Sequence, residues 1–340
     1  MLRLSCLIKT RYNHYKYYEV NKIKIAIEGG AGYTAGELIR ILINHPFTEI
    51  SYINSESHEG QPVSAVHHDL LGEPDLHFSK ILFDDVDVLF LCKGHGQSVN
   101  YLESNQLPAS LKIIDLSQDF RRENNGFVYG LPELQRERIR QASKIANPGC
   151  FATSIELALL PLAEAGLLND DIHITSITGS TGAGQSLSES SHFSWRNNNV
   201  SVYKPFRHQH LTEINMSLQK LQPGFAGNIN LVPVRGNFTR GILSAIYTNC
   251  PLTIDKIYEL YATYYREHPF VMLSDVNPDL KQVVNTNRCV LFVEKIDCKI
   301  FIISLIDNLI KGASGQAVQN MNLMSGYKED TGLRLKAAGF

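Results

Sequence analysis

Short apolar segments alternate with longer, mixed segments along the first half of the chain. The stretch K-I-K-I-A-I starts at Lys22, and a glycine-rich turn separates it from residues 34–44, where apolar residues recur at helical spacing. Further short apolar runs follow at residues 50–53, 86–92, 113–116 and 144–146. The segments between these runs are long enough for crossover helices, so the pattern predicts a doubly wound α/β domain with a mostly parallel sheet.

The pattern changes after Cys150. Residues 151–165 have helical periodicity, and helical spacing returns at residues 312–325. Between these two segments lie longer strand-like stretches, at residues 172–178, 241–249, 289–296 and 299–306. Connections such as Asp297-Cys298 are too short for a crossover, which favours antiparallel pairing. We therefore predict a second, α+β domain with a largely antiparallel sheet that can cover a face or pair two subunits.

The composition narrows the class of protein. A chain of 340 residues with 44% hydrophobic and 19% charged residues can form two globular domains. A net charge of -2 and a pI near 6.6 give no electrostatic reason to expect nucleic acid or a membrane surface as partner, which leaves a small molecule. The six cysteines are scattered, without a C-x-x-C pair, which indicates a reducing compartment such as the cytoplasm.

The glycine-rich turn is the first candidate binding site. In I-A-I-E-G-G-A-G-Y-T-A-G-E-L, Gly29, Gly32 and either Ala35 or Gly36 follow a predicted strand and open a predicted helix. Glycines in this position allow a tight turn and close approach of the backbone to a pyrophosphate, whose charge the helix N-terminus stabilises. The spacing is G-x-x-G-x-x-A, so a purely structural turn is the alternative.

The candidate nucleophile lies in N-P-G-C-F-A-T-S, residues 147–154. Pro148 and Gly149 predict a sharp turn that places Cys150 at the N-terminus of the next helix, where the helix dipole and free N–H groups stabilise a thiolate. The alternative is a small buried cysteine in a core helix. Cys92 and Cys289 lie inside apolar strands and fit that alternative better.

The candidate acid or base lies in F-R-H-Q-H-L-T-E-I, residues 206–214. His210 and Glu213 are three residues apart at the start of a predicted helix, so the carboxylate can orient the imidazole or contact a substrate. His208 is the competing candidate, and a solvated polar cluster is the structural alternative. We predict no metal site, because no further cluster with ligand spacing accompanies H-x-H.

These segments together resemble the N-acetyl-γ-glutamyl-phosphate reductase family, which is related to aspartate-semialdehyde dehydrogenase. The resemblance runs from about Lys22 to the C-terminal helix. The segments that carry it are G-G-A-G-Y-T-A-G-E-L, D-V-D-V-L-F-L-C-K-G-H-G-Q-S, I-D-L-S-Q-D-F-R, Y-G-L-P-E-L, N-P-G-C-F-A-T, H-Q-H-L-T-E-I and D-N-L-I-K-G-A-S-G-Q-A-V-Q-N-M-N. It implies an NADP-dependent enzyme of arginine biosynthesis that reduces an acyl phosphate through a thioester on Cys150, with His210 as the acid/base.

The resemblance also implies the domain organisation. Residues 22–150 and 312–340 form a Rossmann-type dinucleotide-binding domain, and residues 151–311 form the catalytic and dimerisation domain of a homodimer or homotetramer. We interpret residues 1–21 as an extension outside the fold. The residues implied to bind the cofactor are Gly29, Gly32, Tyr33, Thr34, Ala35, Ser55, Gly315 and Asn320.

Three positions depart from the family pattern. Ala152 and Thr212 stand where the family usually has proline, and Glu56 stands where it often has an arginine near the cofactor ribose. The first two leave the predicted chemistry intact. Glu56 leaves the choice between NADP and NAD undecided. An acidic side chain accepts hydrogen bonds from a ribose 2′-hydroxyl and repels a 2′-phosphate, which favours NAD over NADP.

Several polar side chains are candidates for substrate contacts. Asn147 and the N–H of Cys150 are candidate donors to an oxyanion, and Glu213 is a candidate substrate contact. Guanidinium groups bind phosphate and carboxylate, so the candidate cations are Arg121, Arg207, Arg235 and Arg240, with solvated surface arginines as the alternative. Three other functions remain open: a reductase of another acyl phosphate, a cysteine hydrolase on a Rossmann scaffold, and a non-catalytic dinucleotide sensor. No motif identifies the N-acyl group of the substrate.

Overall fold

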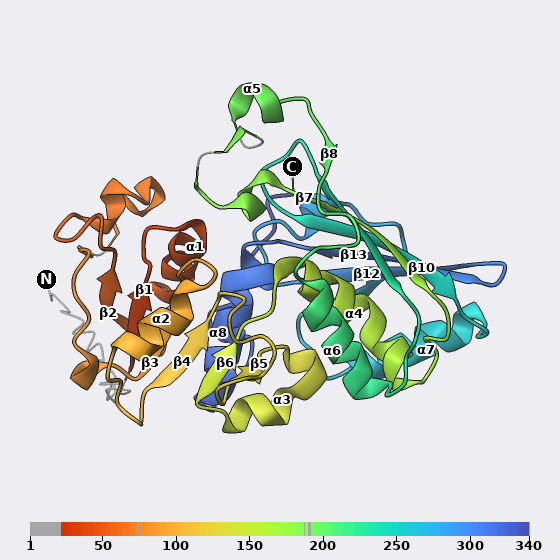
Figure 1. Cartoon of the computed structure of the whole chain (residues 1–340), viewed down its shortest axis with the longest axis horizontal. Helices are drawn as coiled ribbons and strands as arrows, with labels where there is room; N and C mark the ends of the chain where they lie inside the picture. Colours follow the sequence, from red (N-terminus) through yellow and green to blue (C-terminus); the bar gives the residue numbers. More distant parts are fainter. Residues whose placement is uncertain (1–21, 74, 187, 190–191, 340) are drawn as a thin grey trace, which may run out of the picture.

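The computed structural model describes residues 22–73, 75–186, 188–189 and 192–339. These residues form two halves, each built on its own sheet, that pack against each other along one side (Figure 1). The predicted extension, residues 1–21, lies outside the described residues. No helix in the described part of the chain has both the length and the apolar character needed to cross a membrane.

The first half is built on a parallel sheet in the order β2-β1-β3-β4-β6-β5. Its strands are β1 (Ile23–Glu28), β2 (Thr48–Asn54), β3 (Val88–Leu91), β4 (Lys112–Asp115), β5 (Val128–Tyr129) and β6 (Lys144–Ala146). Its helices are α1 (Tyr33–Leu42), α2 (Gln97–Ser104), α3 (Pro132–Gln141) and α8 (Gly315–Met324). The first of these strands and helices match the predicted β1-turn-α1 unit.

Both faces of this sheet are buried, as a parallel sheet requires. Along β1, Ile25 and Ile27 pack with α1 and α8, whereas Ala26 belongs to the cluster on the face that α2 covers. The apolar residues of α8, among them Ala317 and Met321, therefore complete the core of the first half, although α8 follows the second half in sequence (Figure 1). Short 3₁₀ turns lie at Val63–Ala65, His68–Leu70 and Phe83–Asp85.

The second half is built on a mixed sheet in the order β11-β12-β13-β10-β7-β9-β8. Its strands are β7 (Ile172–Thr178), β8 (Ser201–Val202), β9 (Ile229–Arg235), β10 (Ile242–Asn249), β11 (Val271–Ser274), β12 (Cys289–Ile296) and β13 (Lys299–Ile306). The four longest predicted strands are present, and β12 and β13 form the hairpin that the short Asp297-Cys298 connection predicts. Most neighbouring pairs are antiparallel, while β7–β9 and β11–β12 are parallel, so the predicted fold class is confirmed.

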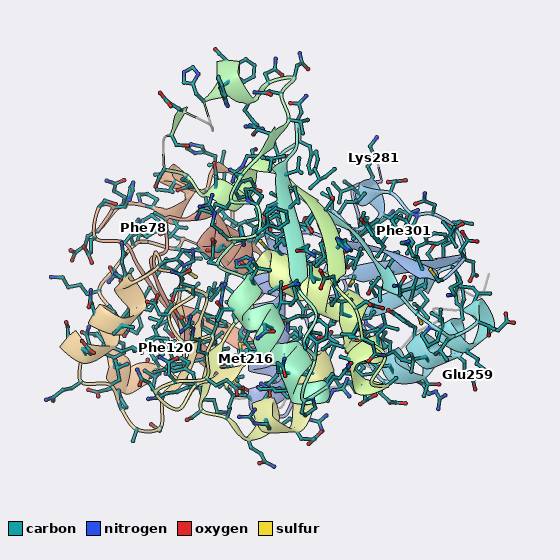
Figure 2. The ribbon with its side chains drawn as sticks, turned by 45° about the vertical axis from the view of Figure 1, so that its right-hand side comes forward. Phe78, Phe120, Met216, Glu259, Lys281 and Phe301 are labelled. Atoms are coloured by element: carbon teal, nitrogen blue, oxygen red, sulfur yellow. The ribbon has the colours of Figure 1, made fainter. Side chains whose placement is uncertain are left out.

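One long helix forms the centre of the second half. Helix α4 (Cys150–Glu164) is buried from Phe151 to Ala163, because its sequence is mostly apolar and buried polar residues such as Ser154 and Glu156 have hydrogen-bond partners. It packs between the sheet and the helices α6 (Leu211–Leu221) and α7 (Ile254–Tyr265). Figure 2 shows Met216 of α6 near the middle of the molecule and Glu259 of α7 at its outer end. Further helical segments in the described part of the chain are α5 (Phe193–Arg196), Ser180–Ala183, Leu280–Gln282 and a π-helical turn at Ile310–Ser314.

Candidate active site

The glycine turn after β1 needs glycine at Gly29 for two reasons, its backbone conformation and its close packing against the end of β3. Gly29 has a φ of +83°, and a Cβ atom added there would lie 2.8 Å from the carbonyl oxygen of Cys92. Gly32 is the N-cap residue of α1, and no side chain caps that helix. The first N–H groups of α1 are therefore free of side-chain acceptors, which is the arrangement that suits the pyrophosphate of a dinucleotide.

A cleft of about 490 Å³ lies between the two halves of the molecule. It is lined by residues 32–34, 92–95, 116, 121, 147–151, 178, 181–186, 203, 208–210, 308–309 and 312–313. The cleft thus joins the glycine turn, the cysteine segment and the histidine segment, which lie far apart in the sequence. Three of the motifs chosen from sequence share one cavity.

Cys150 is the first residue of α4, as the Pro148-Gly149 turn predicts. Its side chain is half-buried and is not part of a disulfide. Burial raises the pKa of the Cys150 thiol to about 11, although the charge of Arg121 and the N–H of Phe151 act to lower it. The helix N-terminus therefore offsets only part of the cost of burying a thiolate, and the thiol is protonated at neutral pH until a base removes its proton.

Gly149 is the residue on which the polar groups of the site converge. A Cβ atom added to Gly149 would lie 2.6 Å from Arg121 Nη1 and from Glu213 Oε1, and closer still to His210 Nε2. Its own N–H donates to Glu213 Oε2 at 2.9 Å. Only glycine leaves room for these three side chains directly before Cys150, which explains the N-P-G-C sequence in physical terms.

Glu213 is the centre of a buried hydrogen-bond network. Arg121 Nη1 donates to Glu213 Oε1 at 3.0 Å, and the Tyr129 hydroxyl donates to Glu213 Oε2 at 2.9 Å. Arg121 also donates from Nε to the carbonyl oxygen of Asn147 at 2.9 Å and from Nη2 to that of Leu116 at 3.2 Å. Arg121 therefore fixes both Glu213 and the backbone that precedes Cys150. Tyr129 is the first residue of the Y-G-L-P-E-L motif, but its position in the sequence gave no indication of this contact.

His210 is the N-cap residue of α6, and its Nε2 lies 3.9 Å from Glu213 Oε1. Burial lowers the pKa of His210 well below its ordinary value, and the charge of Arg121 and the neighbouring His208 lower it further. His208 also lines the cleft, and its Nδ1 accepts a hydrogen bond from the N–H of His210 at 3.3 Å. Burial and the charge of nearby Lys204 lower the pKa of His208 to about 4. Both imidazoles are therefore neutral at pH 7, and His210 can accept a proton.

The lowered pKa of His210 predicts a measurable titration. A depressed imidazole pKa means that the ring stays neutral as the pH falls through the ordinary value of 6.5 and gains its proton only at lower pH. The test is histidine NMR across a pH series, with His210→Asn used to assign the resonance. We expect the chemical shift of the His210 ring to be the same at pH 6 as at pH 8, whereas a titration midpoint near 6.5 would contradict the assigned environment.

Most of the residues predicted to bind a cofactor lie at the glycine turn, in α1 or directly after β2, and two lie on α8. Gly32, Tyr33 and Thr34 line the cleft, and Gly29 shapes the turn beside it, while Ala35 is buried in α1. Ser55 follows β2, where its hydroxyl lies 3.4 Å from Ser57 Oγ and 3.2 Å from His58 Nδ1.

Gly315 and Asn320 do not line the cleft. Gly315 packs against Asn287, and Asn320 Nδ2 donates to the carbonyl oxygen of Gly130 at 2.9 Å and to Asn147 Oδ1 at 3.1 Å. The family resemblance implied that these two positions bind the cofactor, but both residues are buried in the protein interior. Gly312 and Ala313 of the π-turn lie at the cleft in their place.

Some of the predicted substrate-binding residues lie at or next to the cleft, and others do not. Asn147 lines the cleft, and its Nδ2 donates to the carbonyl oxygen of Ala313 at 3.0 Å. Arg235 stacks on the ring of Tyr203 at 4.8 Å from its centroid, and among the described residues its buried Nη1 has no hydrogen-bond partner. Arg240 instead pairs with Glu37 and Asp307, and Arg207 is exposed outside the cleft lining.

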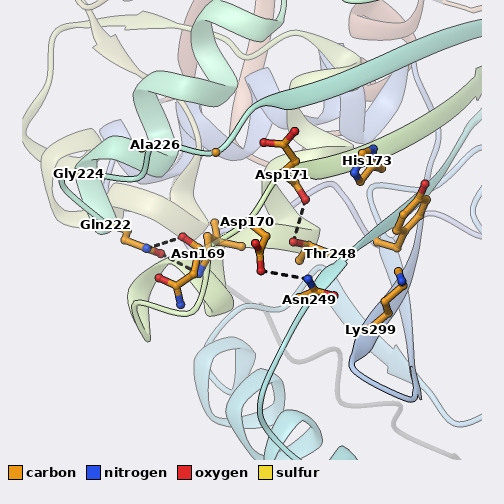
Figure 3. Close-up of a pocket in the computed structure, with 13 residues that line it drawn as sticks. Asn169, Asp170, Asp171, His173, Gln222, Gly224, Ala226, Thr248, Asn249 and Lys299 are labelled. Carbon is orange, nitrogen blue, oxygen red and sulfur yellow. Dashed lines mark hydrogen bonds between the residues drawn. The ribbon is translucent and has the colours of Figure 1, made fainter.

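A second hollow lies at the far end of the mixed sheet (Figure 3). Its polar side chains bond mainly to one another and to the backbone: Asn249 Nδ2 donates to Asp170 at 3.1 Å, and Thr248 Oγ1 donates to the carbonyl oxygen of Asp171 at 3.0 Å. Within residues 22–339, as far as the structure describes them, no group of three or more His, Cys, Asp or Glu side chains is arranged to hold a metal ion.

A Rossmann-type domain whose glycine turn shares a cleft with a cysteine at the first position of a helix and a buried histidine–carboxylate pair defines a class of oxidoreductase, the semialdehyde dehydrogenases. Two family models match the chain: "Semialdehyde dehydrogenase, NAD binding domain" over residues 24–142, and "Semialdehyde dehydrogenase, dimerisation domain" over residues 150–308. The first half is therefore a nicotinamide dinucleotide-binding domain.

Known relatives narrow this class to one family. The chain is 56% identical to the N-acetyl-gamma-glutamyl-phosphate reductase of Parabacteroides distasonis and 52% identical to that of Flavobacterium johnsoniae; each comparison covers 94% of this chain and 100% of the relative. The chain belongs to the N-acetyl-gamma-glutamyl-phosphate reductase family. The resemblance found in the sequence motifs is confirmed.

Solved structures support the fold. Aspartate semialdehyde dehydrogenase II of Vibrio cholerae superposes with a TM-score of 0.68 at 17% identity, covering 90% of this chain and 99% of that one. Aspartate semialdehyde dehydrogenase of Candida albicans, solved with NADP, gives a TM-score of 0.66 at 14% identity, with 90% and 99% coverage. At these identities the likeness shows that the two-domain architecture is shared.

Proposed function

We propose that this enzyme reduces an N-acyl-γ-glutamyl phosphate to the N-acyl-glutamate semialdehyde with NADPH and releases phosphate, as a step of arginine biosynthesis. The observation that carries the proposal is the convergence of Arg121, Glu213 and His210 on Gly149, directly before Cys150, in the cleft that the glycine turn lines. The names of the relatives supply the acyl phosphate as the substrate class.

The first chemical step uses the protonated thiol and the neutral imidazole. His210 takes the proton of Cys150 as the sulfur attacks the γ-carbonyl carbon, and the carbon–oxygen bond to phosphate breaks. The products are a thioester on Cys150, a proton on His210 and free phosphate, which takes up one proton from solvent to leave as hydrogen phosphate. The N–H of Cys150 and the amide of Asn147 are the donors we assign to the oxyanion that forms during attack.

The second step returns the proton. When bound, the dinucleotide supplies the hydride that reduces the thioester carbonyl. The oxygen of the resulting thiohemiacetal takes the proton from His210, and His210 receives it again as the carbon–sulfur bond breaks and the semialdehyde leaves. The proton then passes to the departing thiolate, so that Cys150 and His210 end as they began.

Two arginines are the best candidates for the charged groups of the substrate. Arg121 lines the cleft beside Cys150, which places its charge near the leaving phosphate. Arg235 is outside the cleft lining itself but stacks on the ring of Tyr203, which lines the cleft, and its Nη1 is buried without a hydrogen-bond partner among the described residues. We therefore assign Arg235 to the substrate carboxylate, which a guanidinium binds well. Arg240 is engaged with Glu37 and Asp307, which argues against its binding substrate.

We propose NADP as the cofactor. Ser55, Ser57 and His58 form a polar cluster at the end of β2, where a dinucleotide fold places the adenosine ribose, and they supply donors for a 2′-phosphate. The side chain of Glu56 is 85% exposed and lies 3.5 Å from Lys93 Nζ. Exposure and this cation reduce the repulsion that Glu56 would exert on the phosphate.

Glu56→Arg should therefore tighten NADP binding by about 1 kcal/mol, roughly fivefold, and leave NAD binding almost unchanged. Competitive titration of both dinucleotides on wild type and variant measures this. Glu59→Arg is the matched control, because it makes the same charge change at another exposed position of the loop. A wild type that prefers NAD would overturn the NADP proposal, and an unchanged variant would show that Glu56 is not near the ribose.

We also propose a cytoplasmic homodimer or homotetramer. Residues 150–308 match a dimerisation model, and the sheet face opposite α4 presents partly buried apolar side chains, among them Leu243, Phe292 and Phe301. The described cysteines are free thiols, as in a reducing compartment.

The test of the proposed function is a reverse assay. Purified enzyme is given NADP, phosphate and a series of γ-semialdehydes that differ in their N-acyl group, and NADPH formation is followed. We expect phosphate-dependent reduction of NADP with N-acetyl-glutamate semialdehyde, and the relative rates of N-acetyl and N-succinyl substrates identify the acyl group. Turnover of aspartate semialdehyde in preference to all of these would overturn the substrate assignment.

A further inference from the structure

The π-turn Ile310–Ser314 joins the two halves of the active site and has no role in the mechanism above. Its N–H groups donate to the carbonyl oxygen five residues earlier in the chain. Gly312 N donates to the carbonyl oxygen of Asp307, and Ser314 N donates to that of Leu309, both at 2.9 Å. A π-turn holds one more residue than an α-helical turn, and such turns are common at functional sites. Here the turn brings Gly312 and Ala313 to the cleft.

The turn contacts the cysteine segment closely. A Cβ atom added to Gly312 would lie 2.8 Å from the Cβ of Cys150, so the backbone of the turn packs directly on the cysteine. The carbonyl oxygen of Ala313 accepts a hydrogen bond from Asn147 Nδ2 at 3.0 Å. The position of the turn therefore determines the positions of both Cys150 and the candidate oxyanion donor.

The same turn is bonded to the glycine loop. Ser314 is buried, and its hydroxyl donates to the carbonyl oxygen of Thr34 in the first turn of α1 at 2.7 Å. Thr34 lies in the segment that would hold the dinucleotide pyrophosphate. One hydroxyl thus connects the dinucleotide-binding loop to the element that packs on the cysteine.

Lys311 anchors the turn from the other side. Its ammonium group is fully buried and donates to Glu133 Oε1 at 2.8 Å, Gln316 Oε1 at 2.7 Å and Gln319 Oε1 at 3.0 Å. Each of the three N–H donors of a lysine has a partner, which compensates the burial of its charge. The anchor joins the turn to α3 and α8 of the dinucleotide-binding half.

We propose that Ser314 and Lys311 are positioning residues that fix the distance between the dinucleotide-binding loop and Cys150. The proposal rests on the proposed function for its kinetic consequence. Neither side chain lines the cleft, so each acts through Gly312 and Ala313. Because transfer between two bound groups depends steeply on their separation, a loosened turn lowers the rate of reaction more than it weakens substrate binding.

The test is Ser314→Ala, which removes only the hydroxyl bond to Thr34. Thr248→Val is the matched control: Thr248 also donates a buried hydroxyl to a backbone carbonyl, that of Asp171, but at the far end of the mixed sheet (Figure 3). We expect Ser314→Ala to lower kcat about tenfold with KM unchanged within about twofold, and Thr248→Val to change neither. A Ser314→Ala variant with wild-type kcat would overturn the role of Ser314.

A second measurement needs no turnover. Hydrogen exchange of the peptide that contains the π-turn is compared with and without ADP-ribose 2′-phosphate, which carries the pyrophosphate but no nicotinamide. We expect this ligand to slow exchange of the π-turn in the wild type and to have no effect on it in Ser314→Ala. Equal protection in both proteins would overturn the coupling, and it would do so even if the wild type proved to have another substrate.

The double variant Lys311→Met with Glu133→Gln tests the anchor separately, because it removes both buried charges together. We expect a folded protein by circular dichroism, with kcat lowered about tenfold and KM for the acyl phosphate retained. Faster exchange of the π-turn should accompany the loss, since the turn has lost its anchor. Wild-type kcat and wild-type exchange in this variant would show that Lys311 does not position the turn.

Discussion

Cys150→Ser should lower reductase activity by at least roughly 10³-fold, because the hydroxyl is a far weaker nucleophile than the thiol and its proton is harder for His210 to remove. Burial already raises the pKa of the thiol to about 11, so the site has little capacity to activate a weaker acid. Serine is nearly isosteric, and the glycine turn is untouched. Steady-state kinetics should therefore show the loss, while NADPH titration should show nearly wild-type binding.

Cys289→Ser is the matched control for this experiment. Cys289 is fully buried in β12, outside the cleft lining, and its sulfur lies 3.5 Å from Ser304 Oγ. A serine at that position can keep the hydrogen bond, so activity should stay near the wild-type level. Near-wild-type activity of Cys150→Ser would contradict the proposed mechanism, and equal losses in both variants would point to a general effect on folding.

His210→Asn should lower kcat by roughly 10²-fold or more, because it removes the group that accepts the proton of Cys150. His210 lies beside Glu213 and Gly149, directly before the nucleophile, and its Nδ1 has no hydrogen-bond partner among the described residues. Asparagine occupies a similar volume but cannot serve as a base. The measurement is kcat for the forward reaction near neutral pH.

His208→Asn is the natural comparison, since His208 lines the same cleft and has a lowered pKa as well. Its Nδ1 accepts the N–H of His210, so His208 supports the backbone of that residue. We expect its replacement to cost less than about tenfold in kcat, because asparagine can still accept this bond. A larger loss for His208→Asn than for His210→Asn would move the acid/base role to His208.

Much of the fold could be predicted because its strands and helices differ in the spacing of their apolar residues and in the length of the apolar segments. Strands β12 and β13 are long apolar stretches joined by two residues, which leaves only a hairpin. The turn at Pro148-Gly149 likewise predicted the start of α4 at Cys150. Strand β9 was not predicted, because Ile229–Arg235 contains a proline and pairs in parallel with β7, far away in the chain.

The contacts within the site were harder to predict, because they depend on tertiary packing. Arg121, Tyr129 and Glu213 meet across 84 to 92 residues of sequence, and no local pattern indicates that contact. Arg240 could not be separated from Arg235 by sequence, since only the fold shows that Arg240 pairs with Glu37 and Asp307. The place of Gly312 beside Cys150 depends on the π-turn, which replaces the ordinary helix start expected at residue 312.

Trapping the covalent intermediate tests the central claim, that Cys150 forms a thioester with the γ-acyl group. Enzyme without any dinucleotide is mixed with N-acetyl-γ-glutamyl phosphate, quenched in acid, and examined by intact-protein and peptide mass spectrometry while released phosphate is counted. We predict a burst of one phosphate per active subunit, and an N-acetylglutamyl group on the peptide that contains Cys150. Phosphate release without acylation of that peptide, or the same acylation in Cys150→Ser, would contradict the account.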